Sequence, residues 1–200
     1  MLSLIFLISF IATDNPQNNT AAKEVSEPGI ALNLTVPRKK ISFEIPYREL
    51  SVSRDLDLFL AKANVSWTQK DKEDVIDTLL EIESKYGYRP RLFLKLMQVE
   101  SNFRINAVSK DGAMGLCQIQ PDTAKNISTK MGSPAVPSEL LFDPVINLRL
   151  SAQYLSFLEN RYKALPKAIS AYNMGPGTFS RIYGEGGIPQ GRYHDLLSED

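Results

Sequence analysis

Cysteine and histidine are almost absent from this chain of 200 residues, which contains one of each, Cys117 and His194. A single cysteine cannot form an intramolecular disulfide, and it cannot build a cysteine cluster around a metal ion. Zinc sites draw mainly on cysteine and histidine, so the composition also argues against a zinc site. No local motif supports a nucleophilic Cys117–His194 pair. We therefore expect no metal and no cofactor, and the simplest interpretation is a buried thiol and a surface histidine.

The chain also lacks net charge, because 23 Lys and Arg residues balance 23 Asp and Glu residues. A balanced chain offers no electrostatic argument for capturing nucleic acid or acidic lipid, so we expect no nucleic-acid partner. The 43% hydrophobic and 23% charged content is ordinary for a globular protein. The length suits one domain plus a tail.

The apolar run at the start of the sequence, MLSLIFLISFIA, is too short to cross a bilayer comfortably as a helix. It fits the apolar part of a secretory signal followed by small residues, which predicts a signal peptide over residues 1–22. That interpretation implies export to the periplasm or cell envelope. No Lys or Arg precedes the run, and the alternative is a core strand or helix at the start of the domain.

The segment that follows carries weaker structural signals. Residues 13–40 are rich in Asn, Pro, Thr and Lys and show no sustained period, which is typical of a linker. Ile41 to Trp67 is ambiguous, because ISFEI alternates like a strand whereas LDLFLAKA could form a short helix. We assign residues 23–66 to a linker or N-terminal extension, and residues 67–200 to the folded domain.

Regular helical patterns begin after Thr68, and no internal repeat is visible. The fold class is therefore mainly α, with any strands short and confined to loops. Several predicted helices start at a proline or stop before a glycine, the residue types that favour helix starts and ends. The predicted helices are 72–86, 90 to about 101, 121–131, 144–162 with an inner face of Leu148, Ala152, Leu155, Leu158 and Tyr162, and 167–172.

One acidic side chain, Glu100, projects from the apolar side of a predicted helix in the stretch LMQVESNF. The positions three, four and seven residues before it are Met97, Leu96 and Phe93, which share its helical face. Desolvation disfavours the charged form of a carboxyl group, so such an acid keeps its proton to higher pH. A protonated acid near neutral pH is what general-acid cleavage of an acetal bond requires. The alternative is a helix-end glutamate that reaches water or pairs with a base such as Arg104.

The residues after Glu100 favour the catalytic interpretation. ESNFRINAVSKDGAMGLCQIQPDTA, then FDPVINLRLSAQYL, then AYN and GPG, resemble the signature of the soluble Slt-type lytic transglycosylases of the lysozyme-like superfamily. The match covers roughly Leu79 to Gly187. One such fragment would be weak evidence, but four pieces in the right order are specific. Cys117 stands where the family usually has methionine, which could widen the groove slightly. The family's closing helix is hard to find, with Tyr193 as its candidate remnant.

The resemblance implies a lysozyme-like α-helical domain with a deep glycan-binding groove, which acts on peptidoglycan glycan strands. Such enzymes cleave the β-1,4 bond between N-acetylmuramic acid and N-acetylglucosamine without consuming water. The muramyl 6-hydroxyl attacks its own anomeric carbon and leaves a 1,6-anhydro end. Glu100 would act as the single acid/base of this reaction. We expect a monomer that needs no cofactor, with envelope-associated proteins as its possible protein partners.

Ordinary glycosidases use two carboxylates, so the presence of a second acid matters. The nearest acids after Glu100 are Asp111 in a turn and Asp122 at a helix start, and both positions have structural explanations. This favours a transglycosylase over a goose-type lysozyme, which activates water with an aspartate. The lysozyme stays open as an alternative, as does a non-catalytic peptidoglycan-binding scaffold module.

Five further residues match substrate-binding positions of the family. The resemblance places Ser109 near the sugar acetamido group, although a serine there also suits a turn cap. Gln118 and Gln120 would line the groove as donors and acceptors. Tyr172 would orient the catalytic carboxyl, with a core aromatic as the alternative, and Asn173 would mainly fix the following turn. The sequence does not separate groove from core for three other candidates, Met114, Tyr154 and Tyr183.

Overall fold

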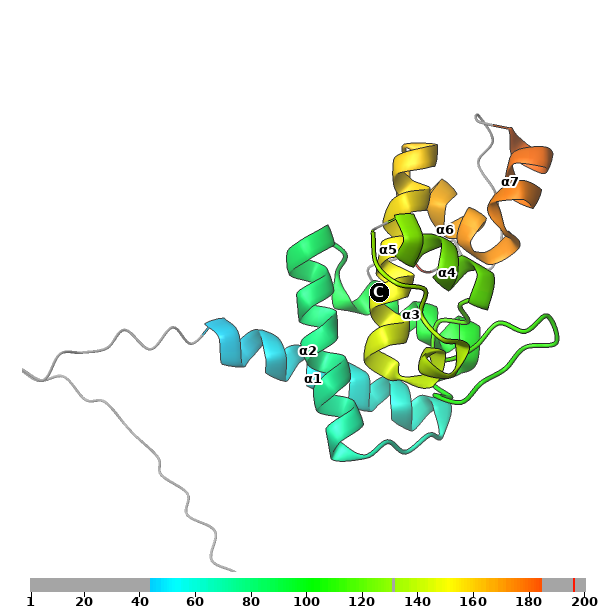
Figure 1. Cartoon of the computed structure of the whole chain (residues 1–200). Helices are drawn as coiled ribbons and strands as arrows, with labels where there is room; N and C mark the ends of the chain where they lie inside the picture. Colours follow the sequence, from blue (N-terminus) through cyan, green and yellow to red (C-terminus); the bar gives the residue numbers. More distant parts are fainter. Residues whose placement is uncertain (1–43, 131, 185–195, 197–200) are drawn as a thin grey trace, which may run out of the picture. The chain divides into compact units, whose positions relative to one another are not determined.

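The computed structural model describes residues 44–130, 132–184 and 196, and the regular structure in these ranges is helical (Figure 1). The predicted signal peptide, Tyr193 and His194 lie outside the described residues. None of the helices in the described ranges is both long and apolar enough to cross a membrane. In chain order the elements are α1 (Glu44–Ala63), α2 (Gln69–Tyr86), α3 (Pro90–Ser101), α4 (Pro121–Lys130), a 3₁₀ helix η1 (Ser138–Phe142), α5 (Pro144–Tyr162), α6 (Leu165–Met174) and α7 (Pro176–Tyr183).

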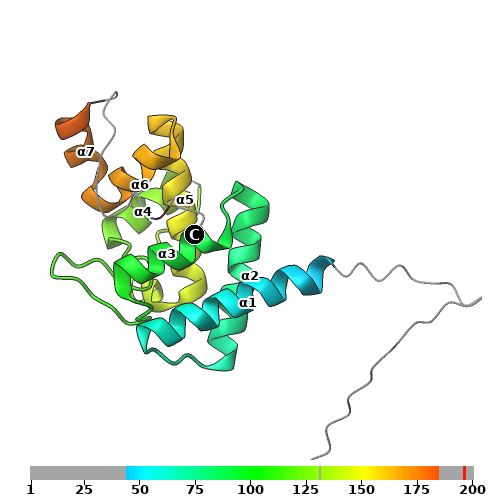
Figure 2. The same ribbon diagram turned by 180° about the vertical axis from the view of Figure 1, so that it is seen from behind.

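Helix α1 occupies a segment that the sequence left ambiguous and that we assigned to the extension. It forms one helix of 20 residues, and Val52, Leu56 and Leu60 are almost fully buried. A spacing of four residues places these side chains on one face of a helix. That face packs against α2 and α3, and Figure 2 shows α1 running across α2. One face of α1 therefore belongs to the hydrophobic core, and the helix is part of the folded domain rather than a linker.

The physical reason for this difference lies on the outer face of α1. Tyr47, Leu50 and Leu58 are large apolar side chains that are 74%, 68% and 63% exposed. Apolar residues on both faces weaken the 3.6-residue hydrophobic pattern by which an amphipathic helix is normally detected. The length of the helix becomes apparent only from the packing of its buried face.

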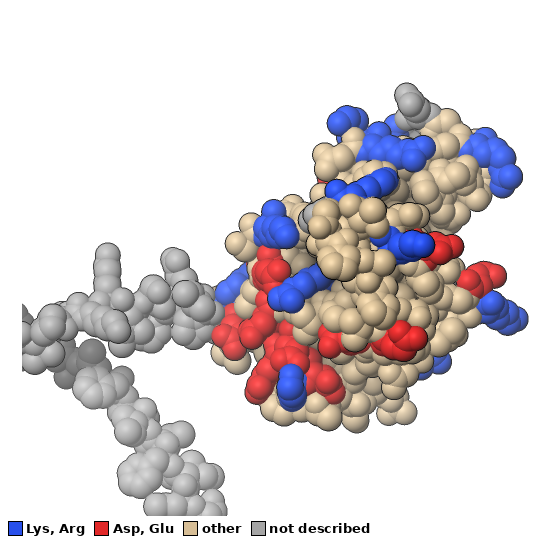
Figure 3. Space-filling view, in the orientation of Figure 1, with Lys and Arg blue, Asp and Glu red and all other residues tan. Residues whose placement is uncertain are grey.

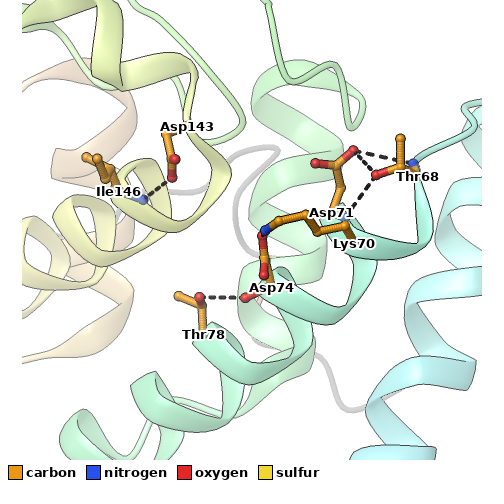
Figure 4. Close-up of polar contacts among 7 residues, drawn as sticks. All are labelled: Thr68, Lys70, Asp71, Asp74, Thr78, Asp143 and Ile146. Carbon is orange, nitrogen blue, oxygen red and sulfur yellow. Dashed lines mark hydrogen bonds and ion pairs between the residues drawn. The ribbon is translucent and has the colours of Figure 1, made fainter.

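Side-chain caps fix the starts of α2 and α5 (Figure 4). The Thr68 hydroxyl accepts a hydrogen bond from the Asp71 backbone N–H at 3.1 Å, and the Asp71 carboxylate accepts one from the Thr68 N–H at 3.3 Å. This reciprocal pair is a capping box. The Asp143 carboxylate accepts a hydrogen bond from the Ile146 N–H at 2.9 Å, directly before the proline that opens α5. Both helix starts are thus determined by local sequence.

Helix α5 lies among α2, α4, α6 and η1 and carries much of the core. The inner face expected from the sequence is buried: Leu148, Ala152, Leu155 and Leu158 are no more than 1% exposed. Burial of each large apolar side chain contributes roughly 1.5–3 kcal/mol. Two polar residues of the same helix, Asn147 and Ser151, are also completely buried. Polar side chains in such surroundings need hydrogen-bond partners, and theirs lead to the functional site.

Charged side chains are unevenly distributed on the face drawn in Figure 3, where acids gather over α1 and α2 and bases lie mainly over the upper helices α5 to α7. Surface ion pairs join the elements, among them Lys72–Asp57 and Arg149–Glu81, both with N–O distances of 2.6 Å. Exposed ion pairs contribute only about 0–1 kcal/mol each. Apolar packing rather than surface charge therefore holds the helices around the site.

Candidate active site

A cavity of about 580 Å³ lies beside the C-terminal end of α3. Its size falls within the roughly 300–1,000 Å³ range of small-molecule sites. All six residues singled out from the sequence line it: Glu100, Ser109, Gln118, Gln120, Tyr172 and Asn173. They come from α3, from the loop between α3 and α4, and from α6, so tertiary folding brings together three separate sequence motifs. The remaining lining residues are Val99, Asp111, Ala113, Ile119, Thr123, Tyr154, Met174, Gly175 and Pro176.

Glu100 is the penultimate residue of α3 and is partly buried. Leu96 and Met97, one turn earlier on its face, are 3% and 0% exposed. The carboxyl group therefore projects from an apolar helix face into a cavity edged by polar groups. Burial is the largest cause of the raised pKa of both the Cys117 thiol and the Tyr172 hydroxyl. The charge of Glu100 raises both pKa values further. Glu100 is thus an electrostatic neighbour of both groups.

The chain turns sharply after α3. Asn102 and Phe103 have φ angles of 50° and 61°, in the left-handed region that a bulky residue such as phenylalanine rarely adopts. The Phe103 ring is completely buried and lies edge-on to Trp67, with ring centroids 6.0 Å apart. The Trp67 indole N–H donates a hydrogen bond to the Phe103 carbonyl at 3.0 Å. These contacts hold the turn that sends the following loop back along the cavity.

Ser109 closes a turn at the edge of the cavity. Its hydroxyl oxygen accepts a hydrogen bond from the Ala113 N–H at 3.0 Å, while its own N–H donates to the Ala113 carbonyl at 2.9 Å. The side chain therefore closes a turn and lines the cavity at the same time. Because that bond uses the hydroxyl as an acceptor, the hydroxyl hydrogen can be donated to a ligand.

The side-chain amide of Gln118 is turned toward the backbone of its own loop. Its Nε2 group donates to the Gly115 carbonyl at 2.9 Å and to the Ala107 carbonyl at 3.2 Å. These two bonds use both amide hydrogens, so Gln118 offers a ligand its carbonyl oxygen rather than the donor and acceptor expected from the sequence. Gln120 donates to the Asp111 carbonyl at 2.9 Å, which uses one of its amide hydrogens.

Tyr172 is 8% exposed, and its hydroxyl donates to the Cys117 carbonyl at 2.9 Å. The sequence led us to expect that this hydroxyl orients the Glu100 carboxyl. Since the Tyr172 hydroxyl hydrogen is donated to the Cys117 carbonyl, the hydroxyl oxygen can interact with Glu100 only by accepting a hydrogen bond from the protonated Glu100 carboxyl group. Burial, followed by the charges of Cys117 and Glu100, raises the pKa of Tyr172 well above its ordinary value. The phenol is therefore neutral at physiological pH.

The structure separates the aromatic and sulfur candidates that the sequence left undecided. Tyr154 lines the cavity, and its ring is tilted against that of Tyr172 at a centroid distance of 5.2 Å. Met114 packs against the core, and Tyr183 contacts the ring of Phe179 at 5.4 Å. A usable signal for Tyr154 was its position on α5, where it shares a face with buried polar residues. Cys117 is completely buried and does not line the cavity, so the structure gives no support for a wider groove at that position.

The two acids that follow Glu100 differ in position. Asp111 is exposed and lines the cavity, whereas Asp122, in the first turn of α4, does not. Within the described ranges, no three Cys, His, Asp or Glu residues lie together in a way that could hold a metal ion. Asp111 is therefore the second carboxylate that any account of the chemistry must consider.

Residues 77–189 match the model of the transglycosylase SLT domain family. The chain belongs to this family. It is 35% identical over 118 residues to membrane-bound lytic murein transglycosylase C of Edwardsiella ictaluri (strain 93-146). That alignment covers 54% of this chain and 33% of the relative, so the SLT-domain chain matches only about a third of the length of that protein.

Solved structures show a similar fold. The 70-kDa soluble lytic transglycosylase Slt70 from Escherichia coli is 22% identical with a TM-score of 0.51, and the match covers 72% of this chain and 23% of Slt70. A complex of the 70-kDa soluble lytic transglycosylase with bulgecin A gives a TM-score of 0.52 at the same identity and coverage. An inactive mutant of the lytic transglycosylase Slt from Pseudomonas aeruginosa is 34% identical over 52% of this chain and 17% of that chain, with a TM-score of 0.48. The prediction of an Slt-type, mainly α, lysozyme-like fold is confirmed.

Proposed function

We propose that this SLT-domain protein is a peptidoglycan lytic transglycosylase in which Glu100 is the acid/base. The observation that carries the proposal is the gathering of Glu100 and five polar residues from three motifs around one cavity. Family membership and the names of the relatives support the same reaction class. The substrate would be the glycan strand of peptidoglycan, and the reaction calls for no cofactor.

The proposed reaction needs a single carboxyl group. Protonated Glu100 donates its proton to the oxygen between N-acetylmuramic acid and N-acetylglucosamine as the bond to the anomeric carbon breaks. The substrate's own 2-acetamido oxygen stabilises the positive charge that develops on this carbon. The Glu100 carboxylate then accepts the proton of the muramyl 6-hydroxyl, whose oxygen bonds to the anomeric carbon. The product is a 1,6-anhydro end, water is not consumed, and Glu100 is again protonated.

The other cavity residues take supporting roles that follow from their hydrogen bonds. The Gln118 carbonyl oxygen accepts a hydrogen bond from a sugar N–H or hydroxyl group. The Ser109 hydroxyl donates to an acetamido oxygen. Tyr172, held neutral, contributes its ring and an accepting oxygen beside Glu100. Gln120 and Asn173 complete the polar rim and contact the sugar less directly.

Hydrolysis by a goose-type lysozyme is the second candidate, and one observation favours it. Asp111 lines the same cavity as Glu100, so a second carboxylate is present for activating water. Asp111 is exposed, and its backbone carbonyl accepts a hydrogen bond from the Gln120 side-chain amide, as expected of a residue that shapes a turn. We favour the transglycosylase because this turn role accounts for Asp111 without catalysis. A non-catalytic scaffold would bind sacculi without cleaving them.

We also propose that the protein acts outside the cytoplasm, in the periplasm or cell envelope. The support is the apolar start of the sequence over residues 1–12, followed by small residues, as in a secretory signal. The substrate class supports the same location. Envelope-associated proteins are the partners to expect there.

The products of digestion test the proposed function. The full chain is incubated with purified sacculi, and the released muropeptides are weighed by mass spectrometry. Anhydro products, lighter by one water than hydrolysis products, support a transglycosylase, and reducing ends identify a lysozyme. Glu100→Gln should reduce turnover by at least about 10³-fold, because the amide cannot transfer the proton. Glu73→Gln, at an exposed position of α2, is the matched control and should leave turnover unchanged. Full activity of Glu100→Gln would refute the mechanism.

A further inference from the structure

The two peptide groups that flank Cys117 are each held by a side chain from a different helix. Its N–H donates to Asn147 Oδ1 of α5 at 2.8 Å. Its carbonyl accepts the hydrogen bond from the Tyr172 hydroxyl of α6 at 2.9 Å. Cys117 itself is completely buried, so neither bond competes with bulk water. Asn147 therefore fixes the Leu116–Cys117 peptide plane, and Tyr172 fixes the adjacent Cys117–Gln118 plane.

Asn147 is bonded at both ends of its amide. Besides accepting from Cys117, it donates through Nδ2 to the Leu141 carbonyl at 2.8 Å and to the Met114 carbonyl at 2.9 Å. The side chain is 0% exposed, and its three bonds all go to backbone groups, two of them in the loop between α3 and α4, 30 and 33 residues earlier in the chain. Removing a buried side chain of this kind leaves its backbone partners unsatisfied, which lowers stability.

Gly115 shows how closely the loop approaches Asn147. Its φ angle is +78°, and a Cβ atom there would lie 2.1 Å from the Leu141 carbonyl oxygen and 2.4 Å from Asn147 Nδ2. Both distances are far below van der Waals contact. The loop can therefore reach the Asn147 amide only with glycine at this position.

The residue after Cys117 is Gln118, which lines the cavity. Its backbone has a φ angle of 51°, and its side-chain amide bonds the carbonyls of Gly115 and Ala107. We propose that Asn147 is a positioning residue of the active site, which holds the Cys117 N–H, and with it this loop segment, so that Gln118 and Tyr172 present their oxygens beside Glu100. This inference rests on the proposed function, because positioning matters only if the cavity binds and cleaves a glycan.

A comparison of single and double variants tests the proposal on the full chain. Asn147→Ser should lower kcat/KM on sacculi about 10- to 100-fold, as expected when reacting groups are displaced. It should weaken binding of an N-acetylglucosamine tetramer in calorimetry by a similar factor. In a Gln118→Ala background, Asn147→Ser should cause a smaller further loss than in the wild type, because part of its effect acts through the residue already removed.

Thr78→Val is the matched control. Thr78 is a buried polar residue of α2 whose hydroxyl donates to the Asp74 carbonyl at 2.7 Å, away from the cavity (Figure 4). It should lower thermal stability and leave tetramer binding unchanged. If Asn147→Ser loses stability but keeps wild-type binding and kcat/KM, Asn147 is merely structural and the proposal is overturned. The same holds if its effect adds fully to that of Gln118→Ala.

Two further measurements keep the test decisive. NMR hydrogen exchange should show the Cys117 N–H and the Gln118 side-chain amide protected in the wild type and exposed in Asn147→Ser, whether or not sacculi are cleaved. Absence of turnover by the wild type would refute the proposed function alone, and unchanged exchange would refute the positioning role alone. If Asn147→Ser does not fold, the isosteric Asn147→Asp replaces it, since it keeps an oxygen acceptor but loses the amide donors. Full additivity of Asn147→Asp with Gln118→Ala would then overturn the proposal.

Discussion

The indole N–H of Trp67 donates a hydrogen bond to the backbone carbonyl of Phe103, 3.0 Å away, and thereby ties the loop after α1 to the turn that follows Glu100. Phe103 sits at a φ angle of 61°, a conformation that costs a bulky residue free energy and persists only where its surroundings enforce it. The hydrogen bond and the buried ring of Phe103 supply that enforcement. The N-terminal helix therefore supports the candidate active site without lining it.

Trp67→Phe keeps an aromatic ring but removes this donor. We expect the free energy of unfolding to fall by about 1 kcal/mol, because the bond is lost and the Phe103 carbonyl loses its partner. Urea unfolding followed by circular dichroism measures the change, since Trp67 is the only tryptophan and fluorescence would be lost. Tyr47→Phe, at a side chain that is 74% exposed, is the control and should change stability by less than about 0.5 kcal/mol. Equal stability of Trp67→Phe and the wild type would contradict this role.

Truncation tests where the folded domain begins. A chain that starts at residue 44 should fold with native helicity, because it retains the buried face of α1. A chain that starts at residue 67 loses Val52, Leu56 and Leu60 from the core, and loss of each such side chain costs about 2–5 kcal/mol. This sum exceeds the stability of many domains, so the shorter chain should aggregate or unfold. A cooperative thermal transition in the chain that starts at residue 67 would show that the folded domain begins there, as the sequence predicted.

The two acids after Glu100 give a test of reaction type. If the protein is a transglycosylase, Asp111→Asn should change turnover on sacculi by less than about threefold, because no water needs activation. If it is a lysozyme, the same substitution should reduce turnover by about 10²-fold or more. Asp122→Asn, at a helix start outside the cavity, is the matched control for both cases. Turnover measured together with product mass distinguishes the two, and a large loss with anhydro products would make Asp111 a second functional carboxylate.

Stability should fall at alkaline pH. Burial raises the pKa of the Cys117 thiol from 9.0 to about 12 and that of Tyr154 from 10.0 to about 12. In the unfolded chain these groups lose their protons at lower pH, so the folded state binds more protons between about pH 9 and 12. The stabilisation is complete below pH 9 and is lost as pH rises toward 12. Urea midpoints measured from pH 7 to 11 should fall, and less steeply for Tyr154→Phe.

The buried thiol also predicts a chemical behaviour. Because the thiolate is the reactive form, native Cys117 should resist iodoacetamide at pH 8 and react fully in urea. Mass spectrometry counts the added groups. Rapid labelling of the native protein would show that the thiol is accessible, contrary to its complete burial.

Local sequence predicted the helices whose ends carry strong signals. Gly87 ends α2 and the Asp143–Pro144 pair starts α5, because capping and proline geometry depend only on nearby residues. The start of α2 was predicted at Lys72, whereas the Thr68 cap starts the helix at Gln69. Helix α1 was missed, since exposed apolar side chains on its outer face obscure the periodicity that reveals a buried face. Similarity to family motifs identified the six cavity residues, but not what their polar atoms do.

The order and chemistry of the motifs determined which residues belong together, since a glutamate on an apolar helix face and the glycine-rich turns are properties of the chain itself. Only the tertiary structure decided how those residues are used. It turned the Gln118 amide toward the backbone, engaged the Tyr172 hydroxyl with the Cys117 carbonyl, and placed Asp111 but not Asp122 at the cavity. The physical reason is that a hydrogen bond depends on distances of about 3 Å between groups far apart in the chain, and packing alone sets those distances.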